Sequence, residues 1–218
     1  MGIVFGRTGS AEPTFVLLQQ NPFPIRHYQP FLLAEVDEGP TEGAGFSVLA
    51  KYIGVFGDPA NESKTAMAMT APVTMTPKKK SGVVTTSSQY SMGFVLPFEY
   101  TKLSQLPLPT DPRIRLSAVP SRVVCVREFS GWYTRAAGWS EFKQLQAQLL
   151  NQGLISLPKD EEEEASSYSI SQYHPPFTLP FLRRNEVWVV LDEGLPPVKA
   201  LLQKLRADKK EAISSTTL

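Results

Sequence analysis

The sequence feature with the clearest chemistry is a row of methionines. Met67, Met69 and Met75 are three of the chain's five methionines, and an extended strand would place their side chains on one face because successive side chains alternate. Thioethers are soft and polarizable, so such a row can adapt to a large flat partner. Methionine also fills gaps in ordinary cores. The pattern alone leaves both interpretations open.

Groups that carry catalysis are sparse. Cys125, the only cysteine, alternates with valines in a strand-like segment and has no histidine close in sequence, so we interpret it as a small buried apolar residue rather than a nucleophile. An internal disulfide is therefore excluded, which fits a reducing compartment. The acidic run at 160–165 lacks the ligand alternation and turn glycine of a calcium loop. The sequence has no nucleophile–base spacing, metal-ligand cluster or paired carboxylates.

Charge and hydropathy narrow the class of protein. The 218 residues carry a formal net charge of +1, and apart from the run Lys78–Lys80, which we expect at an exposed loop tip, basic residues are scattered. Nucleic acid is therefore not an expected partner, because phosphate binding needs a basic stripe. We find no apolar run long enough to cross a membrane and no signal-peptide pattern at the N-terminus. We expect a soluble, cytoplasmic, monomeric protein that does not act at a membrane.

The first half of the chain predicts strands around one helix. Two strands are expected between Phe15 and Val36, broken by a proline-rich turn at 21–24. Apolar residues at three- and four-residue steps from Phe46 to Phe56 predict a helix that Asp58-Pro59 ends. The methionine row predicts a strand over 67–76, and a further strand is expected over 85–96.

The second half repeats this order. Strands are predicted at 113–119 and 122–129, an amphipathic helix at 137–150 and closing strands at 168–173 and 187–191. A short amphipathic helix follows Pro196-Pro197, and we expect residues 209–218 to form a loose tail. We divide the chain into an N-terminal segment (1–13), a main domain (14–193) and a C-terminal helix with a flexible tail (194–218).

Several short blocks occur in a fixed order between about Thr14 and Asp192. They are IRHYQP (25–30), KYIG (51–54), AMTAPV (68–73), FVLP (94–97), VREFSG (126–131), YHPP (173–176) and RNEVW (184–188). In this order they resemble the SOUL heme-binding protein family. The opening MGIVFG and the longer block KYIGVFG (51–57) are also similar to the cytosolic plant and algal branch of that family.

The resemblance implies both a fold and a function. The fold would be α+β, a distorted antiparallel β-barrel of about eight strands flanked by two helices, with a pseudo-twofold internal repeat and the short C-terminal helix. The function would be reversible, non-covalent binding of heme, protoporphyrin or related tetrapyrroles in an apolar cleft, as a carrier or buffer and not as an enzyme. Heme oxygenase or another tetrapyrrole enzyme would be a possible partner. The alternative is a tetrapyrrole-modifying or hydrolytic enzyme on the same fold.

The resemblance also implies where the ligand would bind. One wall of the cleft would be the first helix and the other the loop before the last strand; the residues at the matching positions are Phe46, Leu49, Ala50, Lys51 and Ile53 on the helix and Phe177, Thr178, Phe181, Arg183 and Arg184 on the loop. Phe46 and Ala50 replace methionines of some relatives, Gly43 replaces an arginine and Thr178 replaces a lysine. Pairing with the two propionates would therefore fall to the remaining cations, Lys51, Arg183 and Arg184.

Two histidines are candidate axial ligands for the iron. His27 corresponds to a histidine proposed for that role in one branch, and His174 precedes Pro175-Pro176. Either side chain could equally be an ordinary surface residue, since many relatives bind without such a ligand.

Overall fold

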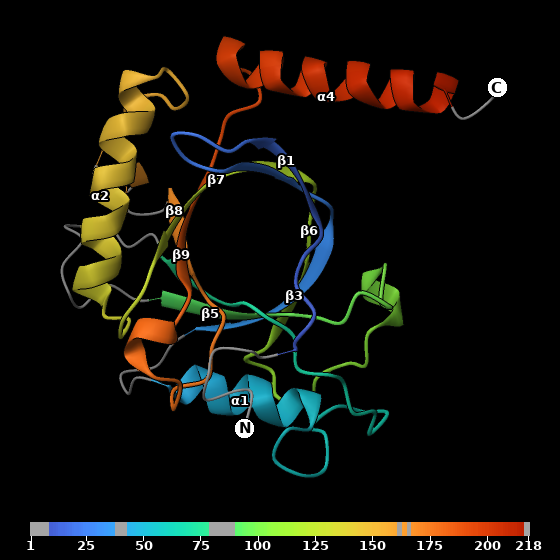
Figure 1. The fold of residues 1–218 in the computed structure, drawn as a ribbon. Coiled ribbons are helices and arrows are strands. Elements are labelled where there is room, and N and C mark those ends of the chain that lie inside the picture. Colours follow the sequence, from blue (N-terminus) through green and yellow to red (C-terminus); the bar gives the residue numbers. More distant parts are fainter. Residues whose placement is uncertain (1–8, 38–42, 79–89, 161–162, 165–166, 216–218) are drawn as a thin grey trace.

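One antiparallel sheet that curls into a barrel-like ring dominates the structure (Figure 1). The computed structural model describes residues 9–37, 43–78, 90–160, 163–164 and 167–215. Within these ranges the sheet has nine strands in the order β1-β2-β7-β9-β8-β4-β5-β3-β6, one more than the eight or so expected. The strands are β1 Phe15–Gln19, β2 Ile25–Tyr28, β3 Phe31–Asp37, β4 Val73–Pro77, β5 Tyr90–Val95, β6 Arg115–Val119, β7 Arg122–Phe129, β8 Tyr168–Gln172 and β9 Asn185–Val190.

The strand order confirms the predicted internal repeat. β4 and β8 pair at the centre of the sheet, and from there β5 matches β9, β3 matches β7 and β6 matches β2 on the two sides. Each half contains two matching strands, a helix and two more matching strands, with α1 Ala44–Ile53 in the first half and α2 Arg135–Asn151 in the second; β1 is an additional edge strand before the first half. The α+β class with two flanking helices is therefore confirmed.

Two proline-containing breaks let the chain cross between the halves. Only Gln29 and Pro30 separate β2 from β3, and only Pro120 and Ser121 separate β6 from β7. Proline has no N–H to donate to a ladder, so pairing stops there and resumes with a different neighbour. β2 pairs with β7, whereas β3 pairs with β5 and β6. The stretch in which we expected two strands therefore holds three.

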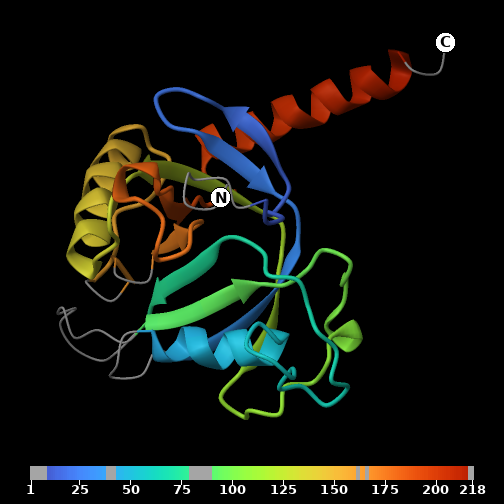
Figure 2. The same cartoon turned by 60° about the horizontal axis from the view of Figure 1, so that its bottom comes forward.

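The two faces of the curled sheet have different environments. α1 packs against β3 and β5, and α2 packs against β7 and β9, so the helices cover the outer face (Figures 1 and 2). On β7, Val123 and Cys125 belong to the large core cluster under the helices, whereas Val124 and Val126 belong to a smaller cluster on the inner face. This alternation follows from the pleat of the strand.

Helix α1 is shorter than the sequence predicted. It ends at Ile53 because Gly54 takes a left-handed conformation (φ 87°) and its N–H bonds to the carbonyls of Ala50 and Lys51, a common glycine stop. Asp58-Pro59 therefore does not end the helix. Phe56 lies beyond it and is 62% exposed.

The methionine row belongs to the core. Regular pairing begins only at Val73, so the expected strand over 67–76 is wrong for residues 67–72; Pro72 lacks the N–H that pairing needs. Met67 and Met75 are buried and Met69 packs against the same cluster. The interpretation of these methionines as core residues is confirmed.

The C-terminal helix is longer than predicted. α4 runs from Pro196 to Ser215, so residues 209–215 are helical and do not form part of a loose tail. Residues 216–218 lie outside the described residues, as do the predicted strand positions 85–89, two of the three lysines at 78–80 and three residues of the acidic run at 160–165. Val198 and Leu202 are buried under the helix, which extends past the barrel (Figures 1 and 2). In the part of the chain that is described, no helix is both long and apolar enough to span a bilayer.

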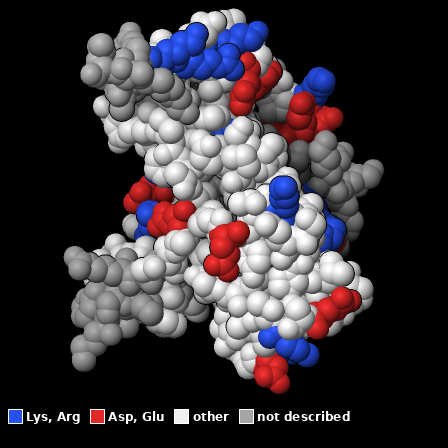
Figure 3. Space-filling model, turned by 90° about the vertical axis from the view of Figure 1, so that its right-hand side faces the viewer, with Lys and Arg blue, Asp and Glu red and all other residues white. Residues whose placement is uncertain are grey.

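The face drawn in Figure 3 has no continuous basic stripe. Blue and red side chains are interspersed there on a mostly uncharged surface, with basic side chains grouped mainly at the top, on α4. This distribution agrees with the scattered charges of the sequence and gives no footprint for a nucleic acid backbone on that face.

The packing of α2 on the sheet can be tested by cavity formation. Phe142 is 0% exposed and its ring stacks on that of Tyr168 with centroids 4.3 Å apart. Phe142→Ala should lower the free energy of unfolding by about 3–5 kcal/mol, the usual cost of emptying a buried aromatic position. Urea unfolding followed by circular dichroism measures the change. Leu157→Ala, at a position 76% exposed, is the control and should change stability by less than about 0.5 kcal/mol; equal losses in both variants would contradict the packing.

Candidate functional site

Four large apolar side chains are exposed together beside the β8–β9 connection. Phe177, Leu179 and Phe181 on this connection are 62%, 40% and 71% exposed, and Trp132 on the turn after β7 is 56% exposed. We call these four residues the aromatic surface. Where exposed apolar side chains form a patch, the patch often binds a ligand or partner.

Backbone contacts fix the aromatic surface in place. The N–H of Gly131 donates to the carbonyl of Pro180 at 2.9 Å, and the side-chain amide of Asn185 donates to the carbonyl of Gly131 at 3.1 Å. Pro180 begins the short 3-10 helix η2 (Pro180–Leu182). Thr178, one of the predicted site residues, is buried, and its N–H donates to the carbonyl of Pro175. Trp132 is thus tied to the loop although it comes from a different part of the chain.

Arg183 places a positive charge next to the Trp132 ring. Its guanidinium lies 4.6 Å from the centre of the Trp132 ring and donates through Nη1 to the carbonyl of Pro176 at 3.3 Å. The side chain is only 7% exposed, and burial lowers the pKa of Arg183 from its usual value. Among the described residues it has no carboxylate partner, and its Nε–H lacks an acceptor. A buried cation in this state favours an incoming carboxylate.

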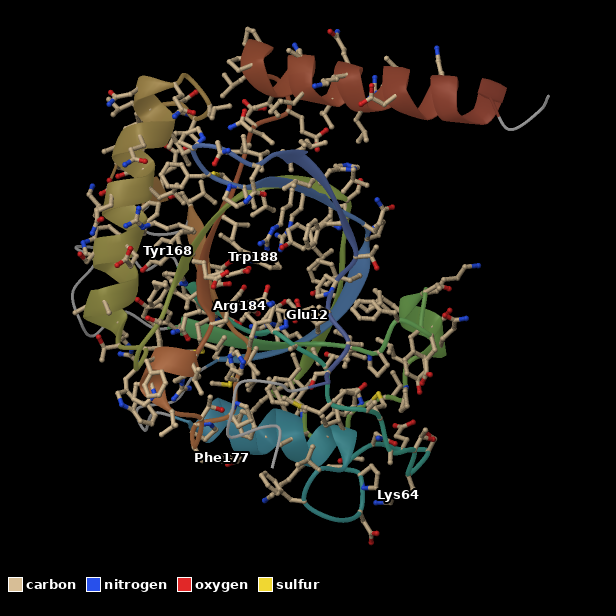
Figure 4. All side chains as sticks on the ribbon, viewed as in Figure 1. Glu12, Lys64, Tyr168, Phe177, Arg184 and Trp188 are labelled. Atoms are coloured by element: carbon tan, nitrogen blue, oxygen red, sulfur yellow. The ribbon has the colours of Figure 1, made fainter. Side chains whose placement is uncertain are left out.

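Arg184, its neighbour, is engaged elsewhere. Its Nη2 donates to Glu12 at 2.5 Å, its Nε lies 3.6 Å from Glu186 and its guanidinium is 3.4 Å from the ring centre of Tyr173. Although burial acts against the charge, the hydrogen bond to Glu12 helps to raise the pKa of Arg184 above its usual value. Figure 4 shows Glu12 and Arg184 together within the ring of strands. Arg184 is therefore already paired with a carboxylate of the segment before β1.

The helix wall of the predicted cleft is mostly closed. Leu49, Ala50 and Ile53 are 0%, 0% and 2% exposed because they face the sheet. Phe46 is half-buried with its ring edge toward Phe94, 5.2 Å away, and Lys51 is exposed. In Figure 2, α1 and η2 stand apart. The structure thus leaves Phe46 and Lys51 accessible on α1, while contact of a ligand with the other three would require the core to open.

The two histidines lie in different settings. His27 is on β2 and shares its outer face with the buried Ile25. β2 pairs with β1 and β7, whereas α1 packs against β3 and β5. His174 accepts a hydrogen bond at Nδ1 from the N–H of Arg184 at 2.9 Å. A neutral imidazole that accepts at Nδ1 carries its proton on Nε2 and has no lone pair there for iron. A ligand seated between α1 and the loop would therefore not be ligated by His27, and ligation by Nε2 of His174 would require a tautomer change.

The described residues provide little support for a nucleophilic or metal-binding site. Cys125 is 0% exposed, and burial raises the pKa of Cys125 to about 12, so the thiolate that a nucleophile needs is absent at neutral pH. Within those same residues, no group of three or more His, Cys, Asp and Glu side chains is placed to hold a metal ion.

Comparison with known proteins identifies the family. The family described as SOUL heme-binding protein matches residues 10–190, which is most of the chain. The chain belongs to the SOUL heme-binding protein family. The sequence resemblance drawn from the seven short blocks is thereby confirmed, and heme is the ligand that the family indicates. No curated protein matches the chain in sequence.

Several solved structures are similar to this SOUL protein in fold but not in sequence. The C-terminal domain of EcmrR has a TM-score of 0.51 at 11% identity and covers 77% of this chain and 95% of its own. An uncharacterized conserved protein from Listeria innocua has a TM-score of 0.51 at 9% identity, covering 84% and 93%. A hydrolase from the same organism reaches 0.49 at 8% identity, covering 77% and 90%. The two structures with a TM-score of 0.51 share the fold with this chain, and at these identities nothing more.

Trp132 and Glu12 are the site residues that the sequence analysis missed. The turn at Gly131 was predicted, but no pattern in the sequence places the next residue beside Arg183, fifty-one positions further on. The one available signal was the combination of a large aromatic residue with a turn, where side chains are usually exposed.

The burial of Cys125 gives a direct chemical test. In the folded protein we expect its thiol to react with a disulfide reagent such as dithionitrobenzoate at least a hundredfold more slowly than a free thiol, because it is both buried and protonated. Unfolding in guanidinium chloride should restore the normal rate. Fast reaction of the native protein would return Cys125 to the candidate nucleophiles.

Proposed function

We propose that this SOUL protein binds heme and related tetrapyrroles reversibly and non-covalently at the aromatic surface, and that it acts as a carrier or buffer. The observation that carries the proposal is the buried guanidinium of Arg183, which lies against the exposed Trp132 ring and has no carboxylate partner among the described residues. A porphyrin presents a flat apolar ring and two carboxylates, so it needs rings to stack on and a cation to pair with.

The expected affinity is moderate. Burial of about 200 Å² of apolar area contributes on the order of 5 kcal/mol before the cost of ordering is subtracted. One desolvated ion pair adds specificity for the carboxylate end of the ligand. This balance suits a protein that takes up a tetrapyrrole and releases it, for example to heme oxygenase or another tetrapyrrole enzyme, as a monomer in the cytoplasm.

The remaining predicted residues differ in whether they would contact the tetrapyrrole directly. Phe46 and Lys51 are accessible at the α1 side and would contact the ring edge and the second propionate. Arg184 would pair with a propionate only after leaving Glu12. Leu49, Ala50 and Ile53 would support Phe46 from beneath, since they are buried behind it.

Loss of the Arg183 charge should weaken binding of heme in a way that depends on the propionates. Arg183→Gln should bind heme about tenfold or more weakly, because a hydrogen bond to a charged group contributes about 1.5–3 kcal/mol. Heme dimethyl ester, which has no free carboxylates, should bind the wild type and the variant alike. Absorbance titration at the Soret band measures both ligands.

Arg113→Gln is the matched control for this charge change. Arg113 is an arginine on a surface loop, paired with Asp111 and not with residues of the aromatic surface, so its loss should leave both affinities unchanged. If Arg183→Gln and Arg113→Gln weaken heme equally, or if the ester distinguishes wild type from Arg183→Gln, the assigned role of Arg183 is wrong.

If the protein binds the porphyrin mainly through its flat ring, the affinity should depend neither on the two histidines nor on the iron. His27→Ala and His174→Ala should keep heme affinity within about threefold, with at most a changed Soret band, because neither ring is placed to ligate iron at the aromatic surface. Wild type should bind protoporphyrin and heme with similar affinity. Complete loss of heme binding in either variant would contradict a ring-dominated site, and progressive bleaching of bound heme would favour the enzymatic alternative.

A further inference from the structure

The inner face of the barrel holds an arginine side chain in a small aromatic and acidic enclosure. Nη1 of Arg26 donates to both carboxylate oxygens of Glu186, at 3.1 and 3.2 Å, and to the hydroxyl of Tyr28 at 3.0 Å. The guanidinium lies 4.6 Å from the ring centre of Phe15, and the ring of Tyr28 is 4.5 Å from that of Trp188. A planar cation is thus held by one carboxylate with aromatic rings beside it.

Glu186 is held in place by donors other than Arg26. Its side chain is 1% exposed, and it also accepts hydrogen bonds from the hydroxyl of Tyr173 at 2.8 Å and from Nε1 of Trp188 at 2.6 Å. These two donors are uncharged and come from β9 and the end of β8. Arg184, whose Nε lies 3.6 Å from Glu186, is already paired with Glu12. If Arg26 moved away, the carboxylate would therefore keep its position, and the group of Glu12, Arg184 and Glu186 would lack one positive charge.

The enclosure lies next to an open apolar edge of the sheet. Arg26 stands opposite Leu17 on the edge strand β1 and opposite Val124 on β7, whose partner on β9 is Val190. Leu17 and Val190 are each 47% exposed, although strand alternation places them on the same inner face as Arg26, and Phe15 is 39% exposed. Solvent therefore reaches apolar side chains within one residue of the position that Arg26 fills. Figure 4 shows Trp188 inside the ring of strands.

We propose that the position of the Arg26 guanidinium is a second binding site, for a small flat organic monocation of the aryl amidinium or guanidinium class. Arg26 occupies this site in the absence of ligand and moves out through the β1 edge when the ligand enters. Glu186 pairs with the charge of the ligand, Phe15, Tyr28 and Trp188 contact its ring, and Leu17 and Val190 line the entrance. The ligand has the opposite charge to a tetrapyrrole, and the site is separate from the aromatic surface.

Benzamidine, a flat aromatic monocation, is a suitable probe. Isothermal titration should show saturable binding to the wild-type protein, binding at least tenfold tighter to Arg26→Ala, in which the competing guanidinium is gone, and no saturable binding to Glu186→Gln. Benzamide, which is uncharged and of the same shape, should not bind to any of the three. Absence of saturable benzamidine binding to the wild type, or unchanged binding in Glu186→Gln, would overturn the proposal.

Phe15→Ala provides a test that removes the ring 4.6 Å from the Arg26 guanidinium but none of the hydrogen-bond partners of Arg26 or Glu186. Because Phe15 lies on the edge strand, its loss should spare the fold and weaken benzamidine about three- to tenfold by removing one aromatic wall. Leu157→Ala, remote and exposed, should bind benzamidine as the wild type does; equal affinity of these two variants would also overturn the proposal. Heme titration of Phe15→Ala should be normal, so failure of this site is distinguishable from failure of the tetrapyrrole site.

Discussion

The structure depends on a single sheet whose two faces are both buried, the outer face under helices and the inner face inside the curled sheet. Helices α1 and α2 cover its outer face with apolar contacts, while its inner face closes on itself around charged and aromatic groups. Every strand must therefore satisfy two environments with alternate side chains. Because helices and sheet interior take up both faces, the exposed apolar side chains are found at turns, connections and sheet edges, where ligands can reach them.

The inner face shows how such a sheet tolerates buried charge. Glu186 is enclosed and would be costly to bury alone, but Arg26, Tyr173 and Trp188 satisfy its oxygens. The cluster raises the pKa of Tyr28 to about 12, through burial and through the charge of Glu186, so the hydroxyl stays protonated at physiological pH. Arg26 and Glu186 thus hold β2 and β9 together across β7.

The two proposed sites follow from this division of the sheet. At the aromatic surface a guanidinium lacks a carboxylate partner among the described residues, and in our proposal an acidic ligand supplies the missing charge. At the inner face a guanidinium pairs with a carboxylate, and in our proposal a ligand of like charge replaces it. The two sites lie on different elements, since Arg183 is on the connection between β8 and β9 and Arg26 is on β2.

Local pattern was sufficient for much of the fold. The spacing of Phe142, Leu145 and Leu149 predicted the buried side of α2, the order of strands and helices revealed the repeat, and the short blocks identified the family. The ends of helices and strands were predicted less well where a glycine or a proline could stop the element. Gly54 ends α1 four residues before Asp58, and β4 begins only after Pro72. At these positions the choice of stop depends on which backbone groups find partners in the folded chain.

By itself, the sequence determined the family, because its short blocks resemble that family in their order. It also determined the mixed α and β class, the internal repeat and the buried faces of the helices, since these follow from the types and periods of residues close together in the chain. Only the tertiary structure decided that Trp132 lies over Arg183, that Glu12 occupies Arg184 and that Arg26 meets Glu186. The last two contacts join residues 172 and 160 positions apart. These two contacts result from the curl of the sheet and the register of its strands. No local periodicity of the sequence encodes the curl or the register.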